Sequence, residues 1–152
     1  MSTLDPKTLV PRTGTIYPPK FAGPLQGRAK RALGDVFGLA QFGVNLTTLA
    51  PGSWSAQRHW HEKEDEFVYV VEGEITLIDD AGEHVLKPGM CAGFKAGVAN
   101  GHHLVNKSSS PATYIEIGTR SAVENSHYPD VDMKAGKIDS KWVVTKKDGT
   151  GF

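Results

Sequence analysis

Short apolar runs separated by turn residues fill the chain between residues 38 and 120. In "GLAQFGVNLTTLAPG", Val44 and Leu46 fall on one face of an extended segment, whereas Asn45 and Thr47 fall on the other. Runs rich in β-branched and aromatic residues follow in "EFVYVVEGEITLIDDAGEHVLKPG" and "ATYIEIGTR", and "KWVVT" is a last candidate strand. No stretch of about 12 residues has helical periodicity. This pattern predicts an all-β sandwich or barrel.

The chain of 152 residues has the length of one ordinary domain, and no shift in composition marks a second one. We expect an extended N-terminal arm over residues 1–35, because five of the nine prolines lie in the first 30 residues. The best helix candidate, Gly27 to Leu33, is short. The barrel is expected over residues 38–120, with a polar C-terminal tail, 121–152, packed on its outside.

The charge balance excludes several classes of partner. Lys and Arg number 17 and so do Asp and Glu, so no charge excess favours nucleic acid or an anionic membrane.

No run approaches the ~18 apolar residues of a membrane span. The N-terminal "MSTLDPKTLVPRTGT" lacks the apolar core of a signal peptide, which predicts a cytoplasmic location. The single cysteine, Cys91, cannot form an internal disulfide and is expected to be a small buried residue.

The segment "RHWHEKEDE" places two histidines one residue apart. If Gln57 to His61 is a strand, His59 and His61 share a face, whereas Arg58 and Trp60 point the other way. Two imidazoles on one face form a two-ligand clamp for a metal. Neutral imidazole suits Zn, Cu, Fe and Ni and tolerates Mn.

A third metal ligand is available in the acidic run that follows. Glu66 directly precedes the apolar run "FVYVV", so a rigid strand anchors it. Glu62, Glu64 and Asp65 are expected to lie in the turn and to face solvent.

A fourth ligand is expected from "NGHHLVN". His102, Leu104 and Asn106 alternate onto one face of an extended segment, and His103 falls on the other. One of the two histidines should point inward, and the alternation alone does not decide which.

Spacing connects these residues into a recognisable motif. Gly52 is followed by six residues, then His59, one residue, His61, four residues, Glu66, six residues and Gly73. This order resembles the first motif of the cupin family, in which five residues usually follow the first glycine.

The second cupin motif is also present in a looser form. Gly89 is followed by five residues, then by Lys95 and Gly97, after four more residues by His102, and after three further residues by Asn106. Lys95 stands where the family usually has proline, and two extra residues precede the histidine. The spacing to Asn106 favours His102 over His103. The resemblance covers residues 43–118 and is strongest with small single-domain bacterial cupins.

The resemblance implies a double-stranded β-helix, the jelly-roll barrel of cupins. It also implies one divalent transition metal (Fe, Mn, Ni, Zn, Co or Cu) held by His59, His61, Glu66 and His102. Family members often form homodimers, frequently by exchanging N-terminal segments, so a homodimer is expected here.

The ligand set favours an enzyme that acts on a small polar metabolite, a carboxylic acid or a sugar derivative, chelated to the metal. Dioxygenase, decarboxylase, isomerase and lyase activities all occur in the family, and no general base is assigned. The alternative is a non-catalytic small-ligand binder or sensor; a metal-free epimerase-like cupin fits the ligand set less well. Candidate pocket residues are Gln57, Phe94, His103, Tyr114 and Glu116.

Overall fold

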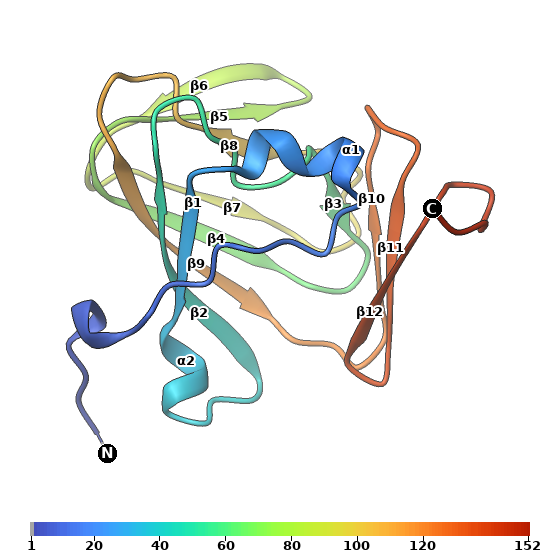
Figure 1. Cartoon of the computed structure of the whole chain (residues 1–152), viewed down its shortest axis with the longest axis horizontal. Coiled ribbons are helices and arrows are strands. Elements are labelled where there is room, and N and C mark those ends of the chain that lie inside the picture. The colour runs from blue at the N-terminus through green and yellow to red at the C-terminus, as the bar shows by residue number, and fades with distance from the viewer. Residues whose placement is uncertain (1) are drawn as a thin grey trace.

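A computed structural model describes residues 2–152 of the chain. Three antiparallel sheets make up the body of the molecule (Figure 1). The largest has the strand order β1-β2-β9-β4-β7, a second has β12-β11-β10-β3, and the third has β6-β5-β8. The predicted all-β class is confirmed. The strands are β1 Arg28–Ala32, β2 Phe42–Leu49, β3 Trp60–His61, β4 Glu66–Glu72, β5 Ile75–Asp79, β6 Gly82–Leu86, β7 Cys91–Phe94, β8 His103–Val105, β9 Ala112–Thr119, β10 Glu124–His127, β11 Lys134–Ile138 and β12 Lys141–Thr145.

Alternation of side chains fixes which face of the large sheet is internal. On β4, Val68 and Val70 are buried, whereas Phe67, Tyr69 and Val71 are exposed on the outer face. The buried side packs against the three-stranded sheet to form one apolar core. That core comprises Leu49, Val68, Val70, Ile75, Leu77, Leu86, Leu104, Ala112 and Tyr114.

A second, smaller core joins the two ends of the chain. Tyr128, Met133 and Ala135 are buried there, and Tyr17 and Phe21 pack against them. The ring centroids of Tyr17 and Tyr128 are 5.6 Å apart in an edge-to-face arrangement. The segment before β1 is therefore held against the C-terminal strands, as Figure 1 shows for β10–β12 and the blue chain trace.

The region before residue 36 contains more regular structure than an extended arm. Its short helices are η1 (Pro6–Thr8), α1 (Pro19–Ala22), η2 (Gly23–Leu25) and α2 (Leu33–Val36). The helix candidate at Gly27 to Leu33 is wrong, because Arg28–Ala32 is a strand paired with β2. Pairing with an existing sheet edge outweighs the helix propensity of Ala, Arg and Lys in "RAKRA", because so short a helix is marginal on its own.

Two further expectations are also corrected. The predicted strand over residues 57–61 is regular only at Trp60–His61. Cys91 is exposed rather than buried, because it lies on the outer face of β7 opposite Tyr69. No helix among residues 2–152 is long and apolar enough to cross a membrane.

Gly73 provides a test of the turn between β4 and β5. Its φ is +77°, and an added Cβ would lie 2.6 Å from the Pro111 carbonyl oxygen and 2.8 Å from Ala112 Cα. Gly73→Ala should therefore combine a left-handed backbone cost of roughly 1–2 kcal/mol with an overpacking cost of about 1–3 kcal/mol. Urea unfolding measures the loss.

Gly52→Ala is the matched control, because Gly52 has a φ of +81° but nothing within 4 Å of its added Cβ. It should show the backbone cost alone. Equal destabilisation by the two substitutions would contradict the close approach at Pro111.

Candidate metal centre and cavity

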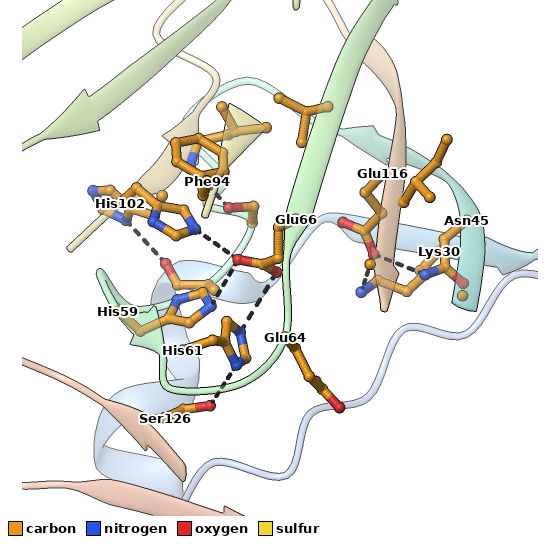
Figure 2. A pocket seen from close by; sticks show the side chains of 18 of the residues that line it. Lys30, Asn45, His59, His61, Glu64, Glu66, Phe94, His102, Glu116 and Ser126 are labelled. Atoms are coloured by element: carbon orange, nitrogen blue, oxygen red, sulfur yellow. Dashed lines mark hydrogen bonds and ion pairs between the residues drawn. The ribbon is translucent and has the colours of Figure 1, made fainter. Parts of the chain in front are cut away.

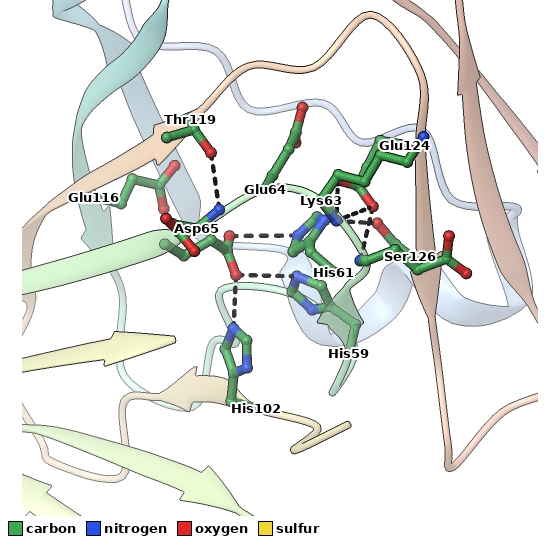
Figure 3. Close-up of polar contacts among 12 residues, drawn as sticks. His59, His61, Lys63, Glu64, Asp65, His102, Glu116, Thr119, Glu124 and Ser126 are labelled. Carbon is green, nitrogen blue, oxygen red and sulfur yellow. Dashed lines mark hydrogen bonds and ion pairs between the residues drawn. The ribbon is translucent and has the colours of Figure 1, made fainter. Parts of the chain in front are cut away.

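The site begins with a pair of backbone hydrogen bonds between two histidines. The His59 N–H donates to the His102 carbonyl at 3.1 Å, and the His102 N–H donates to the His59 carbonyl at 2.9 Å. This bridge brings the two imidazole centroids to 5.2 Å, and the centroid of His61 is 4.9 Å from that of His59. Three imidazoles from two separate segments therefore converge at one point inside the barrel, as Figure 3 shows.

Glu66, the first residue of β4, lies at the centre of this group (Figure 2). One carboxylate oxygen is 2.7 Å from His102 Nε2 and 3.9 Å from His59 Nε2. The other is 3.5 Å from His61 Nε2. The sequence-predicted set His59, His61, Glu66 and His102 is thus gathered in one place, and His102 rather than His103 contacts Glu66.

The second ring nitrogen of two of these histidines is held by a backbone carbonyl. His59 Nδ1 is 2.8 Å from the Gln57 oxygen, and His102 Nδ1 is 3.1 Å from the Asn100 oxygen. A carbonyl can only accept, so Nδ1 carries the hydrogen and the lone pair of the neutral ring lies on Nε2. Both lone pairs are directed toward the Glu66 carboxylate.

Acceptors that face one another need a cation between them, either protons or a metal ion. One ligand atom from each of His59, His61 and Glu66 lies within 4.8 Å of the others, so these residues could hold a metal ion. Imidazole nitrogen and carboxylate oxygen are a donor set that suits divalent transition metals. The Nδ1 contacts also orient the rings as outer-shell partners do in metal sites.

The surroundings favour a neutral His59 and an ionised Glu66. Burial lowers the pKa of His59 to about 4, although the Glu66 carboxylate opposes this shift. Burial also disfavours ionised Glu66, but when Nε2 of His102 and of His61 carries a proton, hydrogen bonds from these rings outweigh burial and hold the pKa of Glu66 well below its usual range. The site therefore presents a neutral imidazole and a carboxylate at neutral pH.

A second group of acidic residues lies behind His61. His61, Glu64 and Glu124 bring ligand atoms within 4.8 Å of one another. However, Glu64 forms an ion pair with buried Lys137, and Glu124 accepts N–H bonds from the backbone of residues 62, 63 and 125. Their charge is already balanced by the protein, so this group is structural.

A cavity of about 690 Å³ opens beside the imidazoles. Phe94 stacks on His102 with centroids 3.6 Å apart, and His103, Tyr114 and Glu116 also line the cavity. The prediction for Gln57 is wrong: it is absent from the cavity lining, and its amide donates to the Phe21 carbonyl at 2.8 Å. The segment before β3 is irregular, so the period of two does not extend back from His59 to Gln57.

Comparisons with known proteins agree with this geometry. A model of the cupin domain matches residues 45–118. The chain is also similar to the crystal structure of a sugar phosphate isomerase of the cupin superfamily from Silicibacter pomeroyi. The identity is 45%, the match covers 99% of this chain and 96% of that chain, and the TM-score is 0.94. The chain belongs to the cupin superfamily.

More distant structures share the cupin fold. A putative sugar phosphate isomerase from Acidithiobacillus ferrooxidans is 27% identical, with 82% of this cupin and 80% of that chain covered and a TM-score of 0.74. A predicted oxalate decarboxylase from Thermotoga maritima is 18% identical over 78% of this chain and 99% of that chain, with a TM-score of 0.63, and shows the fold alone. None of the curated protein sequences is significantly similar to this chain. The predicted jelly-roll barrel is confirmed.

Several cavity residues of this cupin were not predicted from its sequence. Ser126 lies 3.0 Å from His61 Nδ1, and the Tyr128 ring stacks on His59 with centroids 5.6 Å apart. Both belong to the C-terminal tail, which lies outside the two motifs. Glu64 was expected to face solvent and is instead buried against Lys137. The alternation of "ENSHY" could have pointed to Ser126 and Tyr128, but nothing local indicates their partner strand.

The depressed pKa of His59 predicts a pH dependence of the metal-free cupin. Between about pH 6.5 and 4 the unfolded chain binds a proton at this residue and the folded chain does not, so stability falls as pH falls through that window. The contribution is at most about 1.4 kcal/mol per pH unit. NMR titration of the His59 ring should give a midpoint near 4, and His59→Gln should flatten the slope of unfolding free energy against pH. A midpoint near 6.5 would contradict the burial of this ring.

Proposed function

We propose that this cupin binds one divalent transition metal through His59, His61, Glu66 and His102 and isomerises a small sugar derivative. The observation that carries the proposal is the set of imidazole nitrogens directed at one carboxylate in the wall of a cavity. The similar structure from Silicibacter pomeroyi is described as a sugar phosphate isomerase, which supports the reaction class. Fe, Mn, Ni, Zn, Co and Cu all suit these ligands.

A metal at this position would act as a Lewis acid toward the carbonyl and hydroxyl oxygens of a bound sugar. The aldose–ketose interconversion also needs a base that moves a proton between adjacent carbons. Glu116 is placed for that role, because it lines the cavity and makes no contact with the imidazoles. It accepts a hydrogen bond from Asn45 at 3.1 Å and forms an ion pair with Lys30, as Figure 2 shows.

In the proposed step, Glu116 accepts the proton from the carbon beside the carbonyl and returns it to the neighbouring carbon. The electron pair of the broken C–H bond passes through an enediol, and a hydroxyl proton moves to the former carbonyl oxygen. Lys30, which pairs with Glu116, compensates the negative charge that the enediol develops. Phe94 and Tyr114 contribute apolar walls that restrict water.

Metal binding has a direct test. His59→Ala and Glu66→Ala should each reduce the metal content of the purified protein well below one atom per chain, measured by inductively coupled plasma mass spectrometry. Chelation of the wild type should lower the melting temperature, because a metal at about 100 times its dissociation constant stabilises by roughly 3 kcal/mol. His84→Ala is the control, since His84 is half exposed and pairs with Asp79 away from the cavity. Full metal content in the His59 variant would refute the ligand set.

Turnover has a separate test in deuterated water. Wild-type protein loaded with Mn, Co, Ni or Fe should convert a member of a panel of pentose and hexose phosphates and incorporate deuterium beside the carbonyl, followed by NMR. Glu116→Gln should slow both processes by about 100-fold or more, with metal content unchanged. Exposed Glu74→Gln is the control. Binding of sugars without conversion or exchange would instead favour the alternative, a non-catalytic binder or sensor.

Other expectations remain predictions. They are the homodimer, the cytoplasmic location, the lack of a nucleic-acid or membrane partner, and the division into an arm (1–35), a barrel (38–120) and a tail (121–152). The alternative substrate class, a carboxylic acid, can be tested with a similar panel of small acids.

A further inference from the structure

The guanidinium of Arg28 is unusual among the cations of this molecule. Arg28 lies on β1 opposite buried Leu49, so its side chain faces the cavity. Its Nη atoms donate to two neutral backbone carbonyls, that of Ser55 at 2.6 Å and that of Gly14 at 2.9 Å. Its Nε is buried and has no hydrogen-bond partner within residues 2–152. No carboxylate of these residues lies within ion-pair distance of Arg28.

Each of the other cations of the cavity has a carboxylate partner. Lys30 pairs with Glu116, and Lys137 pairs with Glu64. Arg12 and Arg120 both pair with Asp35, which lies outside the cavity lining. Arg28 alone among the cationic lining residues has no carboxylate partner among residues 2–152.

The charge of the whole cavity lining is also positive. Five cationic side chains face three carboxylates, and one of those carboxylates is the Glu66 that the imidazoles surround. A bound divalent metal would increase the imbalance. Removing an unpaired charge from water is costly, so a ligand that brings a negative charge to Arg28 gains affinity from that charge.

Arg28, three tyrosines and the imidazoles line the same cavity. The positive charge of Arg28 opposes the rise that burial causes in the pKa of Tyr17 and of Tyr114. Tyr17 contacts Tyr128, and Tyr128 stacks on His59. Arg28 and the candidate metal ligands therefore line one cavity, which is large enough for a sugar derivative.

We propose that Arg28 binds the acidic group, a phosphate or a carboxylate, of a ligand whose polar end reaches the cluster of His59, His61, Glu66 and His102. The inference rests on the proposed function and adds the residue that selects an anionic ligand. Arginine suits this role, because the free N–H groups of its planar fork can bind two oxygens of one oxyanion.

The experiment measures ligand preference by calorimetry with metal-loaded protein. Ribose 5-phosphate is compared with ribose, glucose 6-phosphate with glucose, and glucuronate with glucose. The wild type should bind at least one anionic sugar about 10- to 100-fold more tightly than its neutral counterpart, the usual effect of a charge-assisted hydrogen bond. The phosphate and carboxylate arms identify which acid group is preferred.

Arg28→Gln should abolish this preference while affinity for the neutral sugar and metal content are unchanged. Arg28→Lys keeps the charge and should retain part of the preference, which covers the case in which the glutamine variant folds poorly. Arg31→Gln is the matched control, because Arg31 lies on the same strand but faces away from the cavity and bonds the Leu9 carbonyl. It should retain the full preference.

Three outcomes would overturn the inference: a wild type with no preference for anionic sugars, an Arg28→Gln variant that keeps the preference, or equal losses for anionic and neutral sugars. The metal content separates the two proposals. Protein that never binds metal contradicts the proposed function, whereas metal-loaded protein without an Arg28-dependent preference contradicts only the role of Arg28.

Discussion

The backbone bridge between His59 and His102 is the contact on which the candidate site depends. Its two hydrogen bonds join segments that are far apart in the sequence, so their side chains meet at a fixed angle. Each of the two imidazoles also bonds a carbonyl two residues earlier in its own segment, that of Gln57 or of Asn100. The same local arrangement therefore occurs on both sides of the bridge. It turns both Nε2 atoms toward Glu66 before any ligand binds, which reduces the ordering cost of binding a cation.

The charges around this bridge are separated into satisfied and unsatisfied groups. Glu64 and Glu124 lie within reach of His61, yet Lys137 and three backbone N–H groups compensate them. Glu66 differs because its nearest polar neighbours are the Nε2 atoms of three imidazoles, with no lysine or arginine partner. A bound cation is thus favoured at Glu66, whereas Glu64 and Glu124 do not need one. The C-terminal strands contribute to this selectivity, since β11 supplies Lys137 and β10 supplies Glu124.

Local patterns predicted the parts of the fold and site that depend on local geometry. The period of two in a strand places His59 and His61 together, and "KWVVT" coincides with β12. Errors arose where a distant partner decides the outcome. "RAKRA" has no apolar alternation, but β2 offers it an edge, so it is a strand. Glu64 resembles a solvated turn residue until Lys137 is brought beside it. These contacts are properties of the tertiary arrangement, and no spacing within the sequence encodes them.

The segments outside the two motifs determine what the cavity can recognise. Residues 45–118 carry the four candidate metal ligands and are the part that matches the general cupin domain. Arg28, Lys30, Tyr17 and Tyr128 lie outside that range, yet all four line the cavity. Many cupins share a barrel and a histidine cluster, so those features alone cannot distinguish one substrate from another. The segments outside residues 45–118 supply all five cationic side chains of the cavity lining, so a difference in substrate between related cupins is expected to arise in these flanking segments.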